Sequence, residues 1–318
     1  MPDPLLIAAR AVDFAALAQF AGLFVFLRLV IEPALLASRN AESSALRVRF
    51  LALAWVSLAL ILLSSIVWLW LEAQAFSGEP LSAVWRDGVV VTVLKETRFG
   101  LNLDVRAVLI ALAVILLSLP GRDGARRQVA LLVLSSGMLA GVAWVGHGGA
   151  TPGSSGDIHL VADVFHLLGV GCWVGGLLPL ALTFAVAGRA RDPIWTGWAT
   201  STTQRFSTLG LWAVGTILVT GVVNSWFLVS GPARLVSTDY GRLLLVKIAV
   251  FLIAIAIAGV NRTWLMPRLV HSDESAAAIR SLRRNGVIEL TLAGMIFLVV
   301  GALGLLPPGV DTMAGMMT

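Results

Sequence analysis

Residues 241–264 read GRLLLVKIAVFLIAIAIAGVNRTW, and a run of this kind decides the fold. Between Leu243 and Val260 the only charged residue is Lys247. About 20 consecutive, mostly apolar residues in a helix are enough to cross the hydrocarbon core of a bilayer. We therefore predict that this segment is a membrane-spanning helix.

The whole chain has the same character as this segment. Of its 318 residues, 58% are hydrophobic and 13% charged, whereas a soluble domain has about 25% charged residues. Comparable apolar runs recur near 12–37, 48–71, 99–119, 128–147, 159–187, 206–229, 241–264 and 286–306. We predict an all-α, polytopic membrane protein, an eight-helix transmembrane bundle that forms one integral membrane domain over residues 1–318.

A ninth apolar stretch, residues 81–94 (LSAVWRDGVVVTVL), is too short to span. Arg86, Asp87 and Gly88 interrupt it. We predict a helix that lies on the membrane surface between the second and third spanning helices.

The orientation follows from the basic residues, because loops rich in Arg and Lys stay in the cytoplasm. One set of connections holds fourteen arginines: Arg39, Arg47, Arg49, Arg122, Arg126, Arg127, Arg189, Arg191, Arg205, Arg262, Arg268, Arg280, Arg283 and Arg284. The other side holds Arg10, Arg86, Lys95, Arg98, Arg234 and Arg242. Both termini and the 146–158 connection should therefore face the periplasm. Topology accounts for the net charge of +5, so we expect lipid and no nucleic acid as a partner.

Several function classes find no support in the sequence. The single cysteine, Cys172, allows neither an internal disulfide nor a cysteine-based metal motif. Phosphate-binding loops and a phosphorylatable DKTG motif are absent, which argues against ATP-driven pumping. The N-terminus opens with Asp3 and two prolines and does not resemble a cleavable signal. We do not expect an enzyme.

Three of the four histidines fall within residues 146–166, GHGGATPGSSGDIHLVADVFH. At 100° per residue, His159, Asp163 and His166 project from one helix face, with the two rings about 10.5 Å apart along the axis. Asp163 could be a ligand, or could fix the tautomer of a ring. Trp173 shares this face and would close the site from below. Clustered ionisable groups in a membrane helix usually mark an ion or proton site, although a water-filled polar vestibule without metal is the alternative.

The residue types point to a transition metal. Imidazole suits zinc, copper, iron and nickel, and thioether sulfur shifts the preference towards copper(I). The tail PPGVDTMAGMMT carries three of the seven methionines, and we expect it on the same side as the histidines. The candidate copper ligands, for Cu(I) or Cu(II), are His147, His159, Asp163, His166, Met313, Met316 and Met317. His271, on the cytoplasmic side, is expected to be a solvated loop residue.

The chain resembles the copper resistance protein D (CopD) family in three segments. They are HLLGVGCWVGGLLPL (166–180), with GH at 146–147 and Asp163 before it; RFSTLGLWAVGTILVTGVVNSW (205–226) with TDYGRLLLVKIAVFLIAIAIAGVNR (238–262); and, more weakly, TRFGLNLDVR (97–106). These motifs lie within residues 97–265, and the first two helices carry none. The resemblance places His147, Asp163, His166 and Trp173 in the family's motif, whereas His159 and the methionines rest on chemistry alone.

This resemblance implies a bacterial inner-membrane protein that handles copper. It implies copper movement into the cytoplasm and a periplasmic copper-binding partner of the CopC type. Two other functions stay open from the residues themselves. One is a cytochrome b type electron carrier, in which two histidines from facing helices bind haem. The other is a membrane anchor or receptor for periplasmic copper chaperones without transport.

Further polar residues lie inside the predicted helices. Towards the outer side they are Asp104, Arg106, Asn224 and Lys247, and towards the inner side Arg28, Glu32, Asn261, Arg262 and Glu289. An unpaired charge inside a membrane costs several kcal/mol. We therefore expect Lys247 and an aspartate at similar depth to form a buried pair, and the inner residues to pair or to extend towards water.

The charge pattern makes a prediction about topology. A cysteine placed at Ser154 should react with a membrane-impermeant thiol reagent added from the periplasm, and one at Ser275 should not. Reversed labelling would overturn the orientation of the whole chain and the placement of the histidines.

Overall fold

The computed structural model describes residues 3–31, 41–119, 124–188, 193–269 and 272–310, and these residues form helices without any strand. The longer helices are α1 (Pro4–Val25), α3 (Ala41–Ser77), α6 (Arg98–Ser118), α7 (Ala125–Gly141), α9 (Gly153–Ala187), α10 (Pro193–Val229), α12 (Asp239–Val260) and α13 (Ser272–Leu303). The shorter ones are η1 (Phe26–Val30), α4 (Leu81–Arg86), α5 (Val89–Glu96), η2 (Val142–Trp144), α8 (His147–Ala150), α11 (Pro232–Ser237), η3 (Asn261–Leu265) and η4 (Pro267–Leu269).

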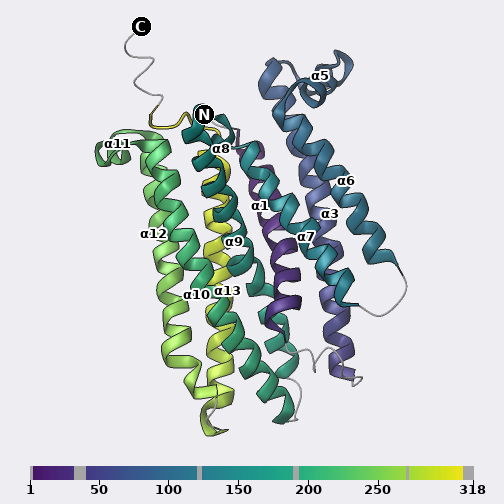
Figure 1. Cartoon of the computed structure of the whole chain (residues 1–318), viewed down its shortest axis with the longest axis vertical. Coiled ribbons are helices and arrows are strands. Elements are labelled where there is room, and N and C mark those ends of the chain that lie inside the picture. The colour runs from purple at the N-terminus through teal and green to yellow at the C-terminus, as the bar shows by residue number, and fades with distance from the viewer. Residues whose placement is uncertain (1–2, 32–40, 120–123, 189–192, 270–271, 311–318) are drawn as a thin grey trace.

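Eight helical segments in the described ranges are long and apolar enough to cross a membrane. Figure 1 shows them side by side in one bundle, with the start of α1, the end of α13, α5, α8 and α11 at the same end. We refer to this as the α8 end. The predicted eight-helix bundle is confirmed, while its orientation in the membrane stays a prediction.

The 81–94 stretch differs from its prediction. It forms two short helices, α4 and α5, because the chain turns at Asp87 and Gly88, where Gly88 has a φ of 74°. A residue with a Cβ rarely adopts this left-handed conformation, so glycine sets the break. The segment packs on α3 and α6 at the α8 end of the bundle (Figure 1).

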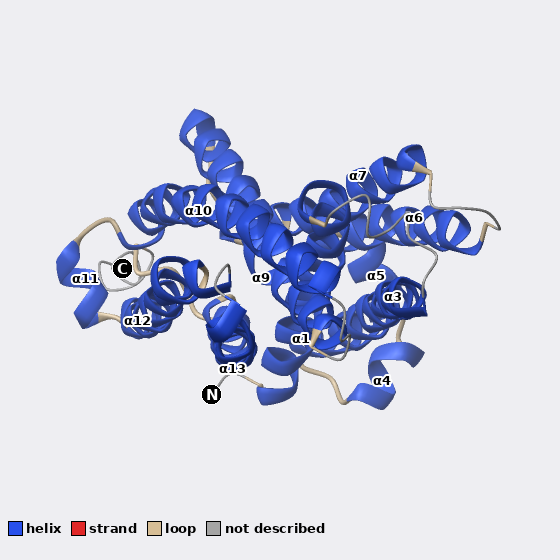
Figure 2. Cartoon of the chain, turned by 90° about the horizontal axis from the view of Figure 1, so that it is seen from below, coloured by secondary structure: helices blue, strands red, loops and turns tan. Residues whose placement is uncertain are grey.

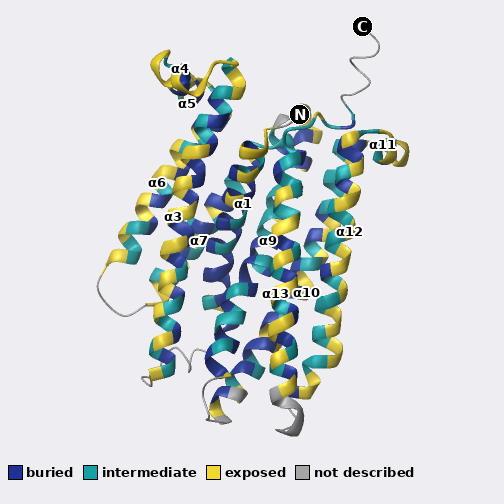
Figure 3. Ribbon diagram, turned by 180° about the vertical axis from the view of Figure 1, so that it is seen from behind, coloured by how far each residue is buried: buried dark blue, intermediate teal, exposed yellow. Residues whose placement is uncertain are grey.

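Helix α9 occupies the centre of the bundle. It packs against α10, α1, α13 and α7, and Figure 2 shows these neighbours around it. Outward faces of the peripheral helices expose apolar side chains (Figure 3); Trp212, Val222 and Trp226 of α10, for example, are 70–75% exposed. Exposed apolar surface on this scale is expected of a protein whose outside faces lipid.

Small residues allow α1 and α9 to approach at backbone distance. Ala18 and Gly22 of α1 face Gly171 and Gly175 of α9, each pair spaced by four residues. A Cβ on Gly175 would overlap the backbone oxygen of Ala18, and one on Gly22 would overlap the backbone of Gly175. Gln19 adds a hydrogen bond from its Nε2 to the Gly175 oxygen at 3.0 Å. This small-xxx-small seam is a common packing mode of membrane helices.

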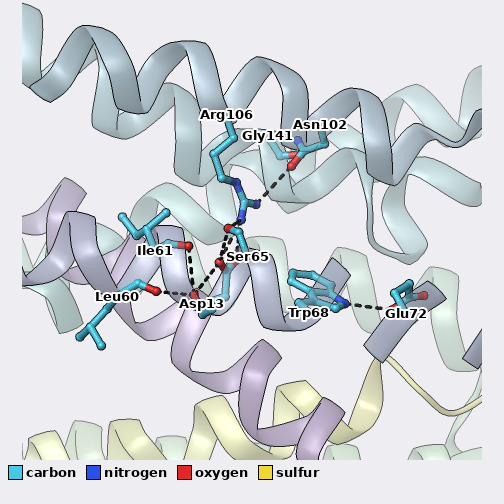
Figure 4. A network of polar contacts seen from close by, with 10 residues as sticks. Asp13, Leu60, Ile61, Ser65, Trp68, Glu72, Asn102, Arg106 and Gly141 are labelled. Atoms are coloured by element: carbon cyan, nitrogen blue, oxygen red, sulfur yellow. Dashed lines mark hydrogen bonds and ion pairs between the residues drawn. The ribbon is translucent and has the colours of Figure 1, made fainter. Parts of the chain in front are cut away.

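A buried ion pair joins α1 to α6. Arg106 Nη1 lies 2.8 Å from Asp13 Oδ2, and the two side chains are 3% and 0% exposed. Ser64 and Ser65 of α3 each donate a hydrogen bond to Asp13 Oδ1 at 3.0 Å, and Asn102 Oδ1 accepts one from Arg106 Nη2 at 3.2 Å (Figure 4). A buried charge is tolerated when it is paired and hydrogen-bonded, as both charges are in this network.

The seam between α1 and α9 gives a prediction about stability. Gly175→Ala should lower the free energy of unfolding by about 1–3 kcal/mol, because the added methyl group forces the two helices apart. Thermal unfolding of the purified protein in detergent measures the effect. The control is Gly259→Ala on α12, where nothing lies within 4 Å of an added Cβ. That change should leave stability unaltered or raise it slightly, since Ala favours a helix over Gly by about 1 kcal/mol. Equal melting temperatures for the two variants would contradict the seam.

Candidate functional site

The histidine-rich connection forms the α8 end of the bundle. Helix α7 ends in the 3-10 turn η2, the chain turns at Val145 and Gly146, and His147 begins α8. After Thr151 and Pro152, α9 begins at Gly153 and carries the other two histidines. From its sequence we expected the segment 148–156 (GGATPGSSG) to be non-helical, and this is wrong, because α8 extends to Ala150 and α9 begins at Gly153.

His159, Asp163 and His166 all face α10, as their spacing predicted. Three pairs join the helices: His159 stacks on Phe227 with ring centroids 4.8 Å apart, Asn224 Nδ2 donates to Asp163 Oδ1 at 3.0 Å, and His166 Nδ1 lies 3.1 Å from Thr220 Oγ1. Residues later in α9 contact residues earlier in α10, which is the pattern of two antiparallel helices. The single polar face is confirmed.

The contact with Thr220 fixes the tautomer of His166. The Thr220 hydroxyl donates its only hydrogen to the backbone oxygen of Thr216, at 2.6 Å. Its oxygen can then only accept, so the hydrogen between the two side chains must belong to Nδ1 of His166. The lone pair of Nε2 is left available to a metal ion. Metal-binding histidines are commonly oriented in this way by a hydrogen bond at the other ring nitrogen.

His159 is held by an analogous arrangement. Its Nδ1 lies 2.8 Å from Thr151 Oγ1, and this hydroxyl donates to the backbone oxygen of His147 at 3.3 Å. The ring is only 1% exposed and is stacked on Phe227. The contact with Nδ1 is the shorter of the two, so the Thr151 hydroxyl can donate to Nδ1 and the tautomer of His159 is not set by this contact. The burial makes His159 less accessible to an arriving ion than His166.

Asp163 connects the two histidine positions. A Cβ on Gly148 would lie 3.2 Å from its Oδ2, so the carboxylate lies against the turn that carries His147. The Nε2 atom of His147 is buried, and its ring lies 5.8 Å from that of Tyr240. Asn224, which holds Asp163, has a buried Oδ1 without a hydrogen-bond partner among the described residues. An oxygen of this kind, next to a carboxylate, suits a bound cation or a hydrogen-bond donor.

Helix α6 holds the His147 segment in place. Arg98 donates a hydrogen bond from Nη1 to the Gly149 oxygen, and Asn102 donates from Nδ2 to the Gly141 oxygen at 2.7 Å. Asn102 also accepts from Arg106. The buried ion pair of the first helices is therefore linked to the turn that positions His147.

Lys247 of α12 faces this site. It interacts electrostatically with Asp163 and with His166. The expected buried ion pair of Lys247 with an aspartate is not found among the described residues: Asp163 interacts with Lys247 only at longer range, Asp104 is exposed and Arg106 pairs with Asp13. Which charged groups lie close together depends on how the helices pack, and the sequence does not show it.

A cavity of about 450 Å³ opens beneath the site. Its mostly apolar wall includes His166, Lys247 and Trp173, the last of which is 5% exposed. Trp173 thus lies below His166 on the same helix, as expected. An ion in this cavity can reach His166, which lines it, but not His159, which does not.

The candidate ligands do not form a complete metal centre. No group of three His, Cys, Asp or Glu side chains in the described ranges is arranged to hold a metal ion. Asp163 contacts the His147 turn, while His166 lies lower, at the cavity. Met313, Met316, Met317 and His271 lie outside the described residues. The ligand set therefore stays a prediction.

Sequence reasoning missed Thr220 and Thr151, and treated Asn224 only as an intramembrane polar residue. A weak signal was present, because Thr220 and Asn224 are four residues apart on α10 and share one helix face, as do their partners His166 and Asp163, three residues apart on α9. Such a match gains meaning only once two helices are known to be antiparallel neighbours.

Two family models match this chain. The family model of the copper resistance protein D-like N-terminal domain matches residues 1–157, and that of copper resistance protein D matches residues 200–303. The resemblance therefore reaches the first two helices, where the sequence offered no motif. The segment 166–180, on which the resemblance was partly based, lies between the two matched regions.

Three curated relatives are similar along much of the chain. Copper resistance protein D of Pseudomonas syringae pv. tomato is 32% identical over 99% of this chain and 100% of its own length. Inner membrane protein YebZ of Escherichia coli is 27% identical over 76% of this chain and 82% of its own. Copper transport protein CutJ of Bacillus subtilis is 29% identical over 64% of this chain and 38% of its own. No solved structure matches the chain.

The role of Thr220 yields a prediction about copper affinity. Thr220→Val should weaken copper(I) binding about 10–100-fold, the usual effect of removing a partner that orients a metal ligand. Thr220→Ser, which keeps the hydroxyl, should bind nearly as the unchanged protein does. Competition with a chromophoric copper(I) chelator measures both. Thr216→Val, one turn away, is the control and should leave affinity unchanged. Unaltered affinity in Thr220→Val would show that the threonine does not orient the ring.

Proposed function

Because this chain belongs to the copper resistance protein D family, we propose that it binds copper at the α8 end of the bundle and carries the ion into the cytoplasm. The observation that carries the proposal is the 3.1 Å contact between His166 Nδ1 and the Thr220 hydroxyl, which leaves Nε2 for a metal ion on a side chain that lines the cavity. We assign His147, Asp163 and His166 to the binding site, with His159 as an additional buried ligand.

The donor set fits copper as the cargo. Imidazole nitrogen binds copper well, and the Asp163 carboxylate supplies a negative charge beside the positive Lys247. Bringing a copper ion next to Asp163 would replace part of the interaction with Lys247. Because the held rings need no rotation before binding, little order has to be created when the ion arrives.

The cavities support movement of the ion through the bundle. The cavity below His166 shares Trp173 with a second cavity of about 190 Å³, whose wall includes Arg262 and Glu289 near the opposite end. The two cavities lie between α9, α10, α12 and α13. We place the α8 end at the periplasm from the arginine pattern, so this route leads inward. The relative named as a copper transport protein agrees with a transport role.

Copper would reach the site from the periplasm. We propose a CopC-type copper-binding protein as its donor, with the methionine tail (Met313, Met316 and Met317) as a capture segment. Thioethers carry no proton at any pH, so they can hold copper(I) where imidazoles are protonated. The end of the described chain fits this role, because the Val310 N–H donates to the Leu228 oxygen and so fixes the base of the tail at the α8 end.

The positions of the described histidines favour copper over haem. His147 belongs to the short helix α8, and His159 and His166 both belong to α9. A haem held by two histidines needs them on opposite sides of the iron, normally from two facing helices. Among the described residues no facing pair of spanning helices supplies two histidines.

Copper binding by histidine variants tests the proposal. His166→Ala and His147→Ala should each lower copper affinity by more than about 100-fold, because a lost ligand costs more than a lost orienting partner. Asp163→Asn should weaken binding less, as an amide oxygen remains. Metal analysis after dialysis of the purified protein against a copper buffer measures the stoichiometry and affinity.

Two further variants complete this test, one as a control for binding and one for the rate of copper loading. His271→Ala should bind copper as the unchanged protein does, because we expect that residue on the cytoplasmic side. Deletion of residues 312–318 should slow copper(I) loading at mildly acidic pH and leave the final affinity unchanged. Full stoichiometric binding in both His166→Ala and His147→Ala would refute the binding site. An unchanged loading rate after deletion of residues 312–318 would show that the tail does not capture copper.

A further inference from the structure

A buried carboxylate lies at the far end of the bundle from the histidines. Glu289 of α13 is 5% exposed and lines the 190 Å³ cavity. Its only hydrogen bond from a residue that the structure describes is a long one, from Asn261 Nδ2 to its Oε1 at 3.5 Å. A buried carboxylate that is ionised normally has several short hydrogen bonds or a cationic partner.

The polar neighbours of Glu289 are occupied with one another. Asn285 Nδ2 donates to Asn261 Oδ1 at 2.6 Å, and Arg262 Nη1 donates to Ser207 Oγ at 2.6 Å. Arg262 lines the same cavity, yet no ion pair joins it to Glu289. The expected ion pairing of the inner residues is therefore not found among the described residues, where Asn261 and Arg262 have hydrogen-bond partners instead and Glu289 has no cation within ion-pair distance.

The other charged groups around Glu289 are few. Helix α13 packs against α1, α9, α12, η3 and η4. From these elements and from α13 itself, the described charged residues towards this end are Arg262 of η3, Arg268 of η4, and the exposed Arg280, Arg283 and Arg284 of α13. Of these, Arg262 and Arg283 line the same cavity as Glu289, and neither forms an ion pair with it. The described parts of α9 and α12 contribute no further charge at this level, because Lys247 lies about 21 Å from Asn261 along its helix.

Such a carboxylate is stable in its neutral form. An ionised carboxylate without a partner at membrane depth is costly, so the group keeps its proton until a cation or water compensates the charge. The cavity beside Glu289 is where such compensation can arrive. It shares Trp173 with the cavity below His166, so an ion that passes Trp173 meets Glu289 next.

The chemistry of the neighbours argues against a second storage site for copper. The groups around Glu289 are carboxylate, amide and hydroxyl oxygens, which suit hard cations rather than copper(I). A copper(I) ion would be attracted by the negative charge of Glu289 once its proton has left, but these oxygen ligands would not retain the ion. Exchange with a proton is the event that this environment favours.

We propose that Glu289 is a proton-exchanging carboxylate that couples the passage of copper to the release of a proton. This inference rests on the proposed function. When the cation enters the inner cavity, the O–H bond of Glu289 breaks, the proton leaves to water, and the carboxylate neutralises the charge of the ion. When the ion leaves, the carboxylate takes up a proton again, and no electron is transferred.

Infrared spectroscopy tests the protonation without copper. The full-length protein should show the C=O stretching band of a buried carboxylic acid that titrates with pH. The band should be absent in Glu289→Gln, which keeps the size of the side chain, and retained in Glu96→Gln, a control at an exposed carboxylate of α5. No such band in the unchanged protein, or an unaltered band in Glu289→Gln, overturns the inference.

Copper uptake tests the coupling. The probe is copper(I), kept reduced with ascorbate, added to phosphatidylethanolamine and phosphatidylglycerol vesicles that contain the protein. Glu289→Gln should slow uptake about tenfold, equivalent to about 1.4 kcal/mol in the barrier, because a neutral amide cannot compensate the ion. Glu289→Asp should retain uptake, and equilibrium copper binding should be unchanged in both.

The outcomes separate this inference from the proposed function. If the unchanged protein neither binds nor takes up copper, the proposed function fails whatever the infrared result. If it takes up copper and Glu289→Gln does so at the same rate, the proposed function stands and the role of Glu289 is overturned.

Discussion

The backbone contact between α1 and α9 is the constraint on which the rest of the bundle depends. Where Gly22 meets Gly175, neither position has room for a methyl group. In a bilayer the lipid tails are as apolar as the helix surfaces, so close packing rather than the hydrophobic effect holds helices together. The seam fixes α9 at the centre, and every other spanning helix is placed around it or around its neighbours.

The position of α9 decides which neighbouring helix its polar face meets. Its face towards α1 is made of small residues, and its face towards α10 carries His159, Asp163 and His166. Because α10 supplies Thr220 and Asn224 at matching levels, each of these polar groups has a partner before any ion binds. A threonine whose hydrogen is already donated to its own helix can only accept, and this fact, rather than distance alone, orients the ring of His166.

Three buried acidic residues differ in how far their charge is compensated by neighbouring groups. Asp13 is neutralised by Arg106 and by two serines, an arrangement that stabilises the first helices and extends through Asn102 to the His147 segment. Asp163 is only partly compensated, by Lys247 at some distance and by one amide. Glu289 has no cation within ion-pair distance in the part of the chain that the structure describes. The degree of compensation falls from the structural pair to Asp163 beside the histidines and to Glu289 in the inner cavity, which is the order expected if the latter two exchange ions or protons.

The sequence by itself determined the features that depend on one helix at a time. Eight spans follow from the length of each apolar run, and the common face of His159, Asp163 and His166 follows from the helical repeat, because both are properties of consecutive residues. The break at Gly88 was within reach of the same reasoning, since a glycine beside an aspartate often marks a turn. The tertiary structure alone decided which groups meet: Asp13 with Arg106, Asn224 with Asp163, Thr220 with His166. Lipid-facing helices have similar apolar surfaces, so nothing local records how far each one rotates or slides against its neighbour, and these two quantities choose the partner of every buried charge.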